Sequence, residues 1–249
     1  MHVQSRQWTR SLWVLAAVVR PLLMVLTKRD WRGTERFPDG GFVLVVNHLS
    51  HADPLLVAHL VHDCGIPPRF LAKASVFGWP VLGPLFRATG QIPVHRGSLE
   101  ASQAYSSAVE AVQRGDCVIV YPEGTLTRDR DLWPMTGGRT GAVRVALATG
   151  CPVVPVAQWG AHQILYPYAR RLRLFPRRTI TMAVGDPVGL DDLRGRPLTV
   201  EVLQEGTERV VTAITGLLEV VRHEVAPPQR FDLRRDRFEQ HTDQQGAGA

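Results

Sequence analysis

Short apolar runs alternate along the chain with segments of helical periodicity, and this alternation constrains the fold more than any other feature of the sequence. Runs of this length are typical of buried strands, and the segments between them favour helices. Alternation of the two predicts an α/β fold with a largely parallel central sheet flanked by helices. The predicted strands cover residues 42–46, 69–72, 91–94, 117–121, 153–157 and 179–184. The predicted helices cover residues 54–62, 98–113, 138–148 and 200–221.

The chain is basic, with a formal net charge of +6 and an isoelectric point near 9.8. Such a surface favours anionic partners, among them nucleic acid, anionic lipid, coenzyme A and acyl carrier protein, and charge alone does not choose between them. The cysteines are three in number and widely spaced. Their spacing indicates a reducing compartment, with no disulfide framework and no paired-cysteine metal site.

An apolar segment near the N-terminus raises the question of membrane contact. Residues 11–26 are apolar except for Arg20, but sixteen residues are too few for a membrane span, which needs about 20. On an ideal helix Arg6, Arg10 and Arg20 fall on one side. The opposite side gathers Trp8, Leu12, Leu15, Val19, Leu22, Leu23 and Leu26. The pattern predicts a helix in the lipid interface with its arginines toward the headgroups, and the alternative is a helix packed on its own domain.

The composition also suggests how the chain is divided. We expect an amphipathic membrane-associating segment over residues 1–35 and a single α/β domain over residues 36–226. The remainder, residues 227–249, contains Pro-Pro, many charges and a Gln-Gln-Gly-Ala-Gly-Ala ending. A segment of this kind cannot bury enough apolar surface to fold, so we expect a disordered tail.

A histidine and an aspartate stand where the first predicted strand ends and the next helix begins, at His48 and Asp53. Reactive groups collect at this edge of α/β sheets. A carboxylate that holds one imidazole nitrogen fixes the tautomer and leaves the other nitrogen as a general base. Asp53 before Pro54 also suits a simple helix cap. As a third possibility, His48, His51 and Asp53 together offer metal ligands.

Three later segments carry further polar groups at strand ends. Residues 89–97 contain Arg96 beside a glycine at the end of a predicted strand, and the planar donors of this arginine suit a phosphate. Residues 121–127 lead a strand into a turn with glycine and hydroxyls, which can present backbone N–H groups to an anion. Residues 153–160 contain a Val-Pro-Val strand. Taken singly, these segments fit a solvated arginine, a common turn and a buried strand.

In this order and spacing, the four segments resemble the glycerolphosphate acyltransferase superfamily, and most closely the bacterial 1-acylglycerol-3-phosphate acyltransferases. The family's Asn-His-x4-Asp motif matches Asn47, His48 and Asp53. Its second block, which ends in an arginine, matches residues 90–96. The Phe-Pro-Glu-Gly-Thr block matches residues 121–125, and Val-Pro-Val matches residues 154–156. The resemblance covers residues 41–160.

The resemblance implies acyl transfer from acyl-CoA or acyl carrier protein to the free hydroxyl of a lysophospholipid, at the cytoplasmic face of the cell membrane. By similarity, His48 would be the base and Asp53 its orienting carboxylate, with no metal and no further cofactor. The predicted phosphate-binding residues are Arg96, Glu123, Gly124, Thr125 and Lys73. Beyond its two substrates, the predicted partner is an anionic membrane surface and not nucleic acid.

One departure concerns the acceptor. The family often continues Glu-Gly-Thr with arginine, whereas this chain has Leu126, and Arg128 two residues later is the predicted replacement. We therefore expect 1-acylglycerol-3-phosphate as the acceptor, with another lyso-lipid as the alternative. Two other classes remain at this stage. One is a metal-dependent lipid hydrolase or phosphoesterase that uses the histidine-aspartate cluster, and the other is a membrane-binding module without activity.

Overall fold

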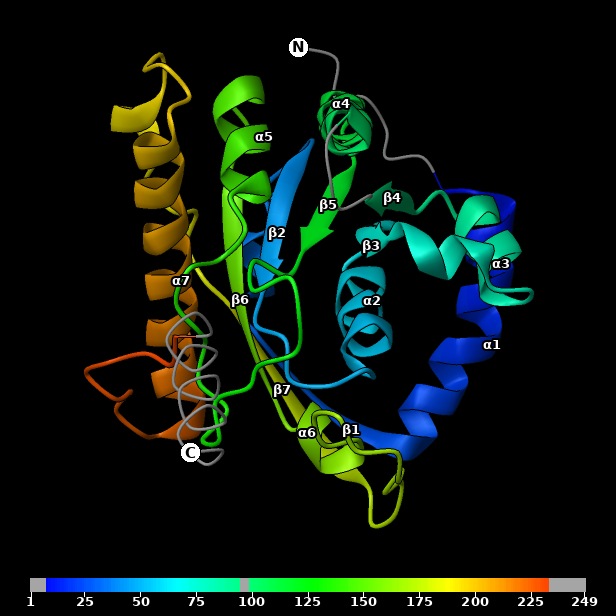
Figure 1. Cartoon of the computed structure of the whole chain (residues 1–249). Coiled ribbons are helices and arrows are strands. Elements are labelled where there is room, and N and C mark those ends of the chain that lie inside the picture. The colour runs from blue at the N-terminus through cyan, green and yellow to red at the C-terminus, as the bar shows by residue number, and fades with distance from the viewer. Residues whose placement is uncertain (1–7, 95–98, 233–249) are drawn as a thin grey trace, which may run out of the picture.

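The computed structural model describes residues 8–94 and 99–232 and confirms the α/β prediction. Seven strands form one sheet in the order β1-β7-β6-β2-β5-β3-β4, with helices on both faces (Figure 1). The strands are β1 (Thr27–Arg32), β2 (Phe42–Val46), β3 (Pro68–Lys73), β4 (Ile92–Val94), β5 (Cys117–Val120), β6 (Val153–Trp159) and β7 (Arg178–Val184). The helices are α1 (Arg10–Leu26), α2 (Asp53–Asp63), α3 (Leu82–Ala88), α4 (Leu99–Gln113), α5 (Gly141–Thr149), α6 (Ala161–Ile164) and α7 (Val200–Arg222).

Strand direction places the functional segments at one edge of the sheet. All neighbouring strands are parallel except β6 and β7. The carboxyl ends of β2, β3, β4 and β5 therefore lie at a single edge, where the predicted motif residues follow them. Because β7 is antiparallel to β6, it begins at the edge where β6 ends. The loop before β7 therefore lies at this edge, and the loop after β7 lies at the opposite end of the molecule.

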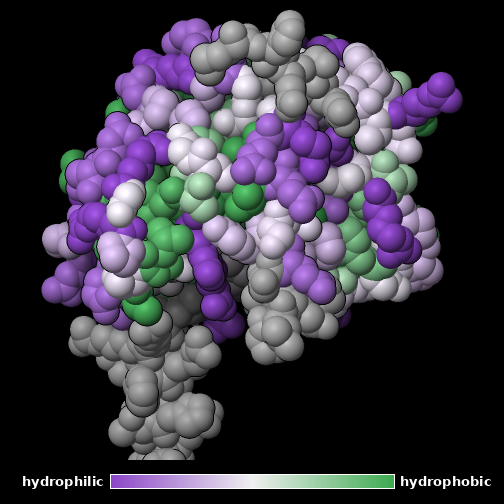
Figure 2. All heavy atoms as spheres, turned by 90° about the horizontal axis from the view of Figure 1, so that it is seen from above, coloured by the Kyte–Doolittle hydropathy of each residue, from purple (hydrophilic) through white to green (hydrophobic). Residues whose placement is uncertain are grey.

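The alternating side chains of β2 build a core on both faces of the sheet. Val43 and Val45 pack in one cluster with α4, α5 and α7. Phe42, Leu44 and Val46 pack in the other, with α2. Seen from the end where β2 begins, the surface is mostly hydrophilic, with separate hydrophobic patches (Figure 2). The central strands are thus covered on both sides, as parallel sheets require.

The edge strand β1 was not predicted, because its sequence Thr-Lys-Arg-Asp-Trp-Arg is polar and charged. Charged side chains are common on edge strands, where they discourage pairing with another chain. Residues 27–32 pair along their whole length with β7. The boundary expected at residues 35 and 36 therefore falls inside the sheet-forming part of the chain. The tail expected from residue 227 begins with described residues, and the Phe231 carbonyl accepts a 2.9 Å hydrogen bond from the Thr136 N–H.

The N-terminal helix is present as α1, but its orientation differs from the prediction. Most of the side predicted to enter lipid faces the protein, where Leu12 is buried and Leu23 packs on the core, although Leu22 of that side is exposed. Arg20, predicted to face headgroups, instead donates a 2.8 Å hydrogen bond to Asp63 at the end of α2. The outward face is apolar as well, with exposed Trp13, Val14, Val18, Leu22 and Val25. Across the described residues, no helix combines the length and apolar character needed to cross a membrane.

Candidate active site

His48 and Asp53 lie in direct contact at the turn between β2 and α2. The His48 Nδ1 atom is 2.8 Å from the Asp53 Oδ2 atom. On a regular helix these side chains would diverge by about 140°. The contact forms because His48 precedes α2 and the chain curls back over the first helical turn. The arrangement fixes the imidazole and leaves Nε2 as the ring nitrogen that Asp53 does not occupy.

Asp53 organises this turn and does not act as the helix cap that its sequence position suggested. The cap position is Ala52, and Asp53 begins α2. The Asp53 Oδ2 atom also accepts hydrogen bonds from the backbone N–H groups of Leu49 at 2.6 Å and Ser50 at 2.8 Å. Complete burial raises the pKa of the Asp53 carboxyl, although His48 and the two backbone donors lower it. One carboxylate oxygen therefore fixes both the backbone of the turn and the imidazole that follows β2.

Tyr121 and Glu123, which follow β5, hold His48 from the other side. The Tyr121 ring stacks on the imidazole, with 4.0 Å between the ring centroids. The Glu123 Oε1 atom accepts a 3.1 Å hydrogen bond from the His48 N–H, and Oε2 accepts one of 3.3 Å from the Met135 N–H. Both oxygens of this carboxyl thus bind the protein backbone. The sequence predicted that Glu123 binds the phosphate, but its contacts in the structure are those of a residue that positions His48.

Burial also changes the protonation of Glu123. It raises the pKa of the Glu123 carboxyl to about 8, and nearby Asp53 and Asp129 act in the same direction. The two backbone donors lower the pKa but do not offset the burial. At neutral pH, the raised pKa keeps Glu123 largely protonated. Glu123 therefore does not add a second full negative charge to that of Asp53 beside the imidazole.

Asn47 and Gln158 join the ends of β2 and β6. The Asn47 Nδ2 atom donates to the Gln158 carbonyl at 3.1 Å, and the Gln158 N–H donates to Asn47 Oδ1 at 2.8 Å. The Gln158 Nε2 atom donates to the Asn47 carbonyl at 2.9 Å. Gln158 was not singled out in the sequence, since it follows the Val-Pro-Val strand without a motif of its own. The two amides fix the backbone immediately before His48.

Two cations, Lys73 and Arg96, are predicted to bind phosphate from the β3 and β4 side of the sheet, and the structure describes Lys73. Lys73 ends β3 and pairs in register with Val94, the last residue of β4. It is exposed and lies at the carboxyl edge of the sheet. Arg96 lies outside the described residues. The register nevertheless places Val94, two positions before Arg96 in the sequence, beside Lys73.

The Glu123-Gly124-Thr125 turn is tight and lies against the His48 backbone. Gly124 has φ = 67°, a left-handed conformation that side chains disfavour, and a Cβ there would lie 2.9 Å from the Arg139 side chain. Two residues after Thr125, the Thr127 N–H donates a 2.8 Å hydrogen bond to the His48 carbonyl. The turn predicted to contact phosphate is therefore attached directly to the residue predicted as the base.

The Leu126 side chain points into the protein and is 3% exposed, so it takes no part in the surface where a phosphate would bind. Its carbonyl accepts a 2.9 Å hydrogen bond from the Tyr168 hydroxyl. Arg128 is exposed, with its guanidinium 5.9 Å from the centre of the Tyr168 ring. Arg128 and Tyr168 thus form a polar surface where the family often has an arginine. Tyr168 lies 42 residues away in the sequence and carries no motif that would have revealed it.

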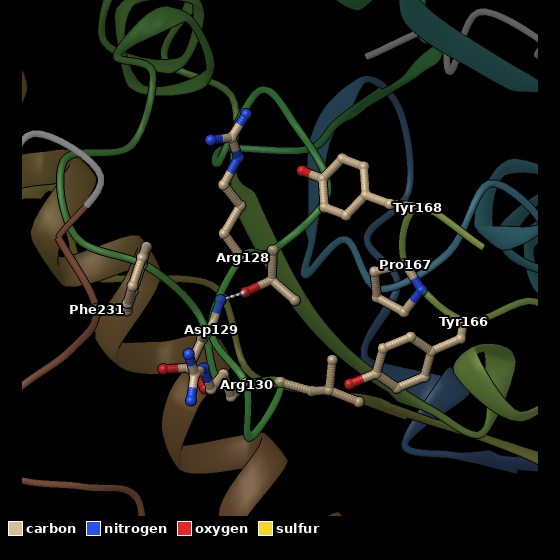
Figure 3. A pocket seen from close by; sticks show the side chains of 9 residues that line it. Arg128, Asp129, Arg130, Tyr166, Pro167, Tyr168 and Phe231 are labelled. Atoms are coloured by element: carbon tan, nitrogen blue, oxygen red, sulfur yellow. Dashed lines mark hydrogen bonds between the residues drawn. The ribbon is translucent and has the colours of Figure 1, made fainter. Parts of the chain in front are cut away.

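This surface borders an open hollow of about 510 Å³ (Figure 3). Arg128, Asp129 and Arg130 form one wall, and Tyr166 and Tyr168 form the facing wall. The remaining lining residues are Thr127, Leu132, Pro167 and Phe231. A hollow of this size holds a group larger than a bare phosphate. The arginines provide anion-binding donors and the tyrosines provide apolar faces with hydroxyl groups.

His51 does not join the pair formed by His48 and Asp53. Its side chain is exposed, whereas Asp53 is completely buried. Within residues 8–94 and 99–232, no three histidine, cysteine or acidic side chains are grouped closely enough to hold a metal ion. The described geometry is that of an imidazole and carboxylate pair, supported by Tyr121 and Glu123.

Comparison with known proteins gives this geometry a family context. The model of a family described as "Acyltransferase" matches residues 28–159. A 1-acyl-sn-glycerol-3-phosphate acyltransferase of Brassica napus chloroplasts is 32% identical over 141 residues, which are 55% of this chain and 39% of that protein. The lyso-ornithine lipid O-acyltransferase of Pseudomonas aeruginosa is 34% identical over 113 residues, which are 45% and 41%. The chain thus matches less than half the length of either relative.

A solved structure shares the fold. The crystal structure of the 1-acyl-sn-glycerophosphate acyltransferase from Thermotoga maritima superposes with a TM-score of 0.64 at 23% identity. The superposition covers 87% of this chain and 81% of the other. At this identity the likeness concerns the architecture, and it agrees with the sheet and helices described above.

Proposed function

The chain belongs to the acyltransferase family, and on this premise we propose that it transfers a fatty acyl group from acyl-CoA or acyl carrier protein to the free hydroxyl of a lysophospholipid. The observation that carries the proposal is the 2.8 Å contact between His48 Nδ1 and Asp53 Oδ2. It holds the imidazole in one orientation at the carboxyl edge of the sheet, with Nε2 available to a substrate hydroxyl.

In the proposed reaction, His48 Nε2 removes the hydroxyl proton as the oxygen attacks the thioester carbonyl carbon. The new carbon–oxygen bond forms, the carbon–sulfur bond breaks, and the departing thiolate takes the proton from the imidazolium. Asp53 stabilises the imidazolium and keeps Nδ1 protonated. No covalent acyl-enzyme is required, since the acyl group passes directly between the substrates. Tyr121 and Glu123 position His48, and we assign Glu123 to this role instead of phosphate binding.

We propose 1-acylglycerol-3-phosphate as the acceptor, with phosphatidic acid as the product, in line with the named activity of the Brassica napus relative. Lys73 and Arg96 would approach the phosphate from the β3 and β4 side. The backbone of Gly124 and Thr125 would approach it from the turn, and Arg128 from the hollow. Each supplies donors suited to a phosphate oxygen.

A specific observation favours another lyso-lipid as the second candidate. Leu126 is buried where the family often has an arginine, and the adjoining hollow is larger than a phosphate needs. The Pseudomonas aeruginosa relative is named for a lyso-ornithine lipid. An acceptor with a larger headgroup would use the hollow, with Arg128 as its anion contact.

We further propose that α1 holds the enzyme at the cytoplasmic face of the membrane as a peripheral or monotopic protein. The outward face of α1 exposes Trp13, Val14, Val18, Leu22 and Val25. Large apolar side chains gathered on one exposed helix face suit burial at a lipid interface. The substrates of the proposed reaction are lipids, so contact at the interface would bring the site to them.

A transfer assay tests the proposal. Labelled acyl-CoA is supplied with lysophosphatidate, and separately with lysophosphatidylglycerol, to the intact protein and to His48→Ala. We expect labelled diacyl product from the intact protein and a loss of about 100-fold or more in the variant. Equal rates for the two proteins would overturn the mechanism. Free fatty acid in place of diacyl product would identify a hydrolase.

A further inference from the structure

Residues 166–178, which connect α6 with β7, combine strong positive charge with apolar side chains. Their sequence is Tyr-Pro-Tyr-Ala-Arg-Arg-Leu-Arg-Leu-Phe-Pro-Arg-Arg, with five arginines and no acidic residue. The surrounding protein has a far more even charge balance, with 29 basic and 23 acidic residues in the whole chain. We call residues 166–178 the arginine loop.

The arginine loop is attached to the protein at several points. Leu174 packs against the core cluster beside α2. The Arg173 N–H donates a 2.8 Å hydrogen bond to the Ile164 carbonyl. Arg177 Nη2 donates to the carbonyls of Met24 and Thr27, at 2.7 and 2.8 Å, where α1 ends. These contacts fix the backbone, so the direction of the remaining side chains is set by the fold.

The outward side chains of the arginine loop are basic and apolar. Phe175 is 73% exposed and Leu172 is 57% exposed, although their neighbour Leu174 is partly buried. Arg170 and Arg171 are exposed, and no ion pair joins either to another described residue. Exposed aromatic and aliphatic side chains can enter the acyl layer of an anionic bilayer, and the unpaired arginines beside them can bind its headgroups.

We propose that the arginine loop is a second membrane contact that binds an anionic bilayer surface together with α1. Phe175 and Leu172 enter the interface, and Arg170 and Arg171 bind lipid phosphates. The proposal rests on the proposed function for its place in lipid synthesis. It adds a separate basic contact, because Arg10 in the first turn is the one exposed arginine of α1, and Arg20 is paired with Asp63.

Two observations locate the arginine loop on the membrane side of the molecule. The hydrogen bonds of Arg177 place it against the end of α1, near exposed Leu22 and Val25, and this end of α1 and the connection from α6 to β7 lie toward the bottom of Figure 1. The loop also begins with Tyr166 and Tyr168, which line the hollow, and the Tyr168 hydroxyl binds the Leu126 carbonyl. A bilayer at this surface would lie beside the candidate site, where a lipid acceptor has to enter.

Charge and shape favour lipid over a protein or nucleic acid partner. Nucleic acid binding uses basic patches and can stack a base on an exposed phenylalanine, but it gains little from an exposed aliphatic side chain such as Leu172. A protein partner usually requires a closely packed, complementary surface. The connection from α6 to β7 instead projects from the molecule near the end of α1 (Figure 1). An anionic bilayer accommodates both kinds of side chain at once.

Vesicle flotation of the full chain tests the proposal. The vesicles are phosphatidylcholine alone, or phosphatidylcholine with phosphatidylglycerol. Arg170→Gln with Arg171→Gln should lower affinity for the anionic vesicles about tenfold, since each arginine near such a surface contributes roughly a few-fold. Phe175→Ser should weaken binding to both kinds of vesicle. The matched control is Arg194→Gln with Arg196→Gln, which removes the same charge beyond the other end of β7.

The proposal is supported if the arginine loop variants lose binding and the control variant retains it. Equal binding by the loop variants and the intact protein would overturn it, and so would an equal loss in the control. The altered loop side chains are exposed, and the control removes only the partly exposed ion pairs of Arg194 with Asp191 and of Arg196 with Glu205. Thermal unfolding should therefore change little and confirms that each variant is folded. Flotation does not depend on catalysis. Failure of the transfer assay would therefore refute the proposed function, while failure of flotation would refute this membrane contact.

Discussion

The turn after β2 and the outward face of α1 differ in how many contacts the protein supplies to their side chains. In the turn, a buried carboxylate meets His48 and two backbone N–H groups, and a second carboxyl holds the backbone from the other side. On α1, six large apolar side chains are exposed, each with 37% to 68% of its surface accessible. In the first region the chain itself supplies these partners, although Asp53 Oδ1 is buried without a hydrogen-bond partner among the described residues. The second leaves apolar surface exposed at a cost that burial in a lipid interface would remove.

The largest expected effect comes from Asp53→Asn, which tests whether the turn is built for chemistry. The amide retains the shape of the side chain but cannot stabilise an imidazolium as a carboxylate does. We expect kcat for acyl transfer to fall about 100-fold or more, with little change in KM for the acyl donor. Steady-state transfer kinetics measure both.

The control for this variant is His51→Ala, which removes an exposed imidazole three residues after His48. We expect its activity to match that of the intact protein. A large loss in His51→Ala with little loss in Asp53→Asn would reverse the assignment of the pair.

A second prediction addresses the other region. Val18→Asp with Leu22→Asp places two charges on the outward face of α1. We expect vesicle binding to weaken about 30-fold, because the apolar burial of two side chains is lost. Val220→Asp, on the exposed side of α7 across the sheet, is the control and should bind normally. If the intact protein, the double variant and Val220→Asp cosediment with vesicles equally well, α1 does not contact the lipid interface.

The sequence predicted the inner region better than the outer one. Apolar runs define strands locally, and the motif from Asn47 to Asp53 lies within one strand–turn–helix unit, so its geometry followed from short-range reasoning. The direction of α1 did not follow, because both its sides are apolar and long-range contacts, such as those of Arg20 with Asp63 and of Leu23 with the core, decide which side faces the protein. Tyr168 and Gln158 were missed for a related reason. They meet Leu126 and Asn47 across long sequence separations that spacing does not encode.

A third prediction concerns the contact that joins the two regions. Asp63 at the end of α2 accepts hydrogen bonds from Arg20, Arg29 and Trp31. Burial raises the pKa of Asp63, but these donors together lower it to about 2. Asp63→Asn should reduce the free energy of unfolding by about 1–2 kcal/mol at neutral pH, a value discounted because the arginines are partly exposed. Denaturant titration provides the measurement.

The sign of the pH dependence provides a further check on Asp63. A lowered carboxyl pKa stabilises the folded protein above the unfolded value of 3.8, and the stabilisation disappears as pH falls toward 2. The difference between the intact protein and Asp63→Asn should therefore shrink over this acidic range. Asp186→Asn, which alters an exposed ion pair with Arg36, should change stability by less than about 0.5 kcal/mol. If both variants behave alike, α1 is not held through Asp63.

The smallest effect on transfer kinetics is expected for Glu123→Gln, which separates a structural carboxyl from a phosphate contact. Burial raises the pKa of Glu123 from 4.5 to about 8, so the folded protein binds this proton more tightly than the unfolded chain. The contribution of Glu123 to stability is therefore greatest below pH 4.5 and is lost as pH rises toward 8. Relative to Glu123→Gln, the intact protein should lose up to about 1.4 kcal/mol per pH unit in this interval. Unfolding titrations across the interval, with KM for the acceptor alongside, give the comparison. If Glu123 positions His48, the free energy of unfolding should depend on pH as described and the acceptor KM of Glu123→Gln should be unchanged. A raised acceptor KM with no difference in this pH dependence would instead show that Glu123 contacts the phosphate.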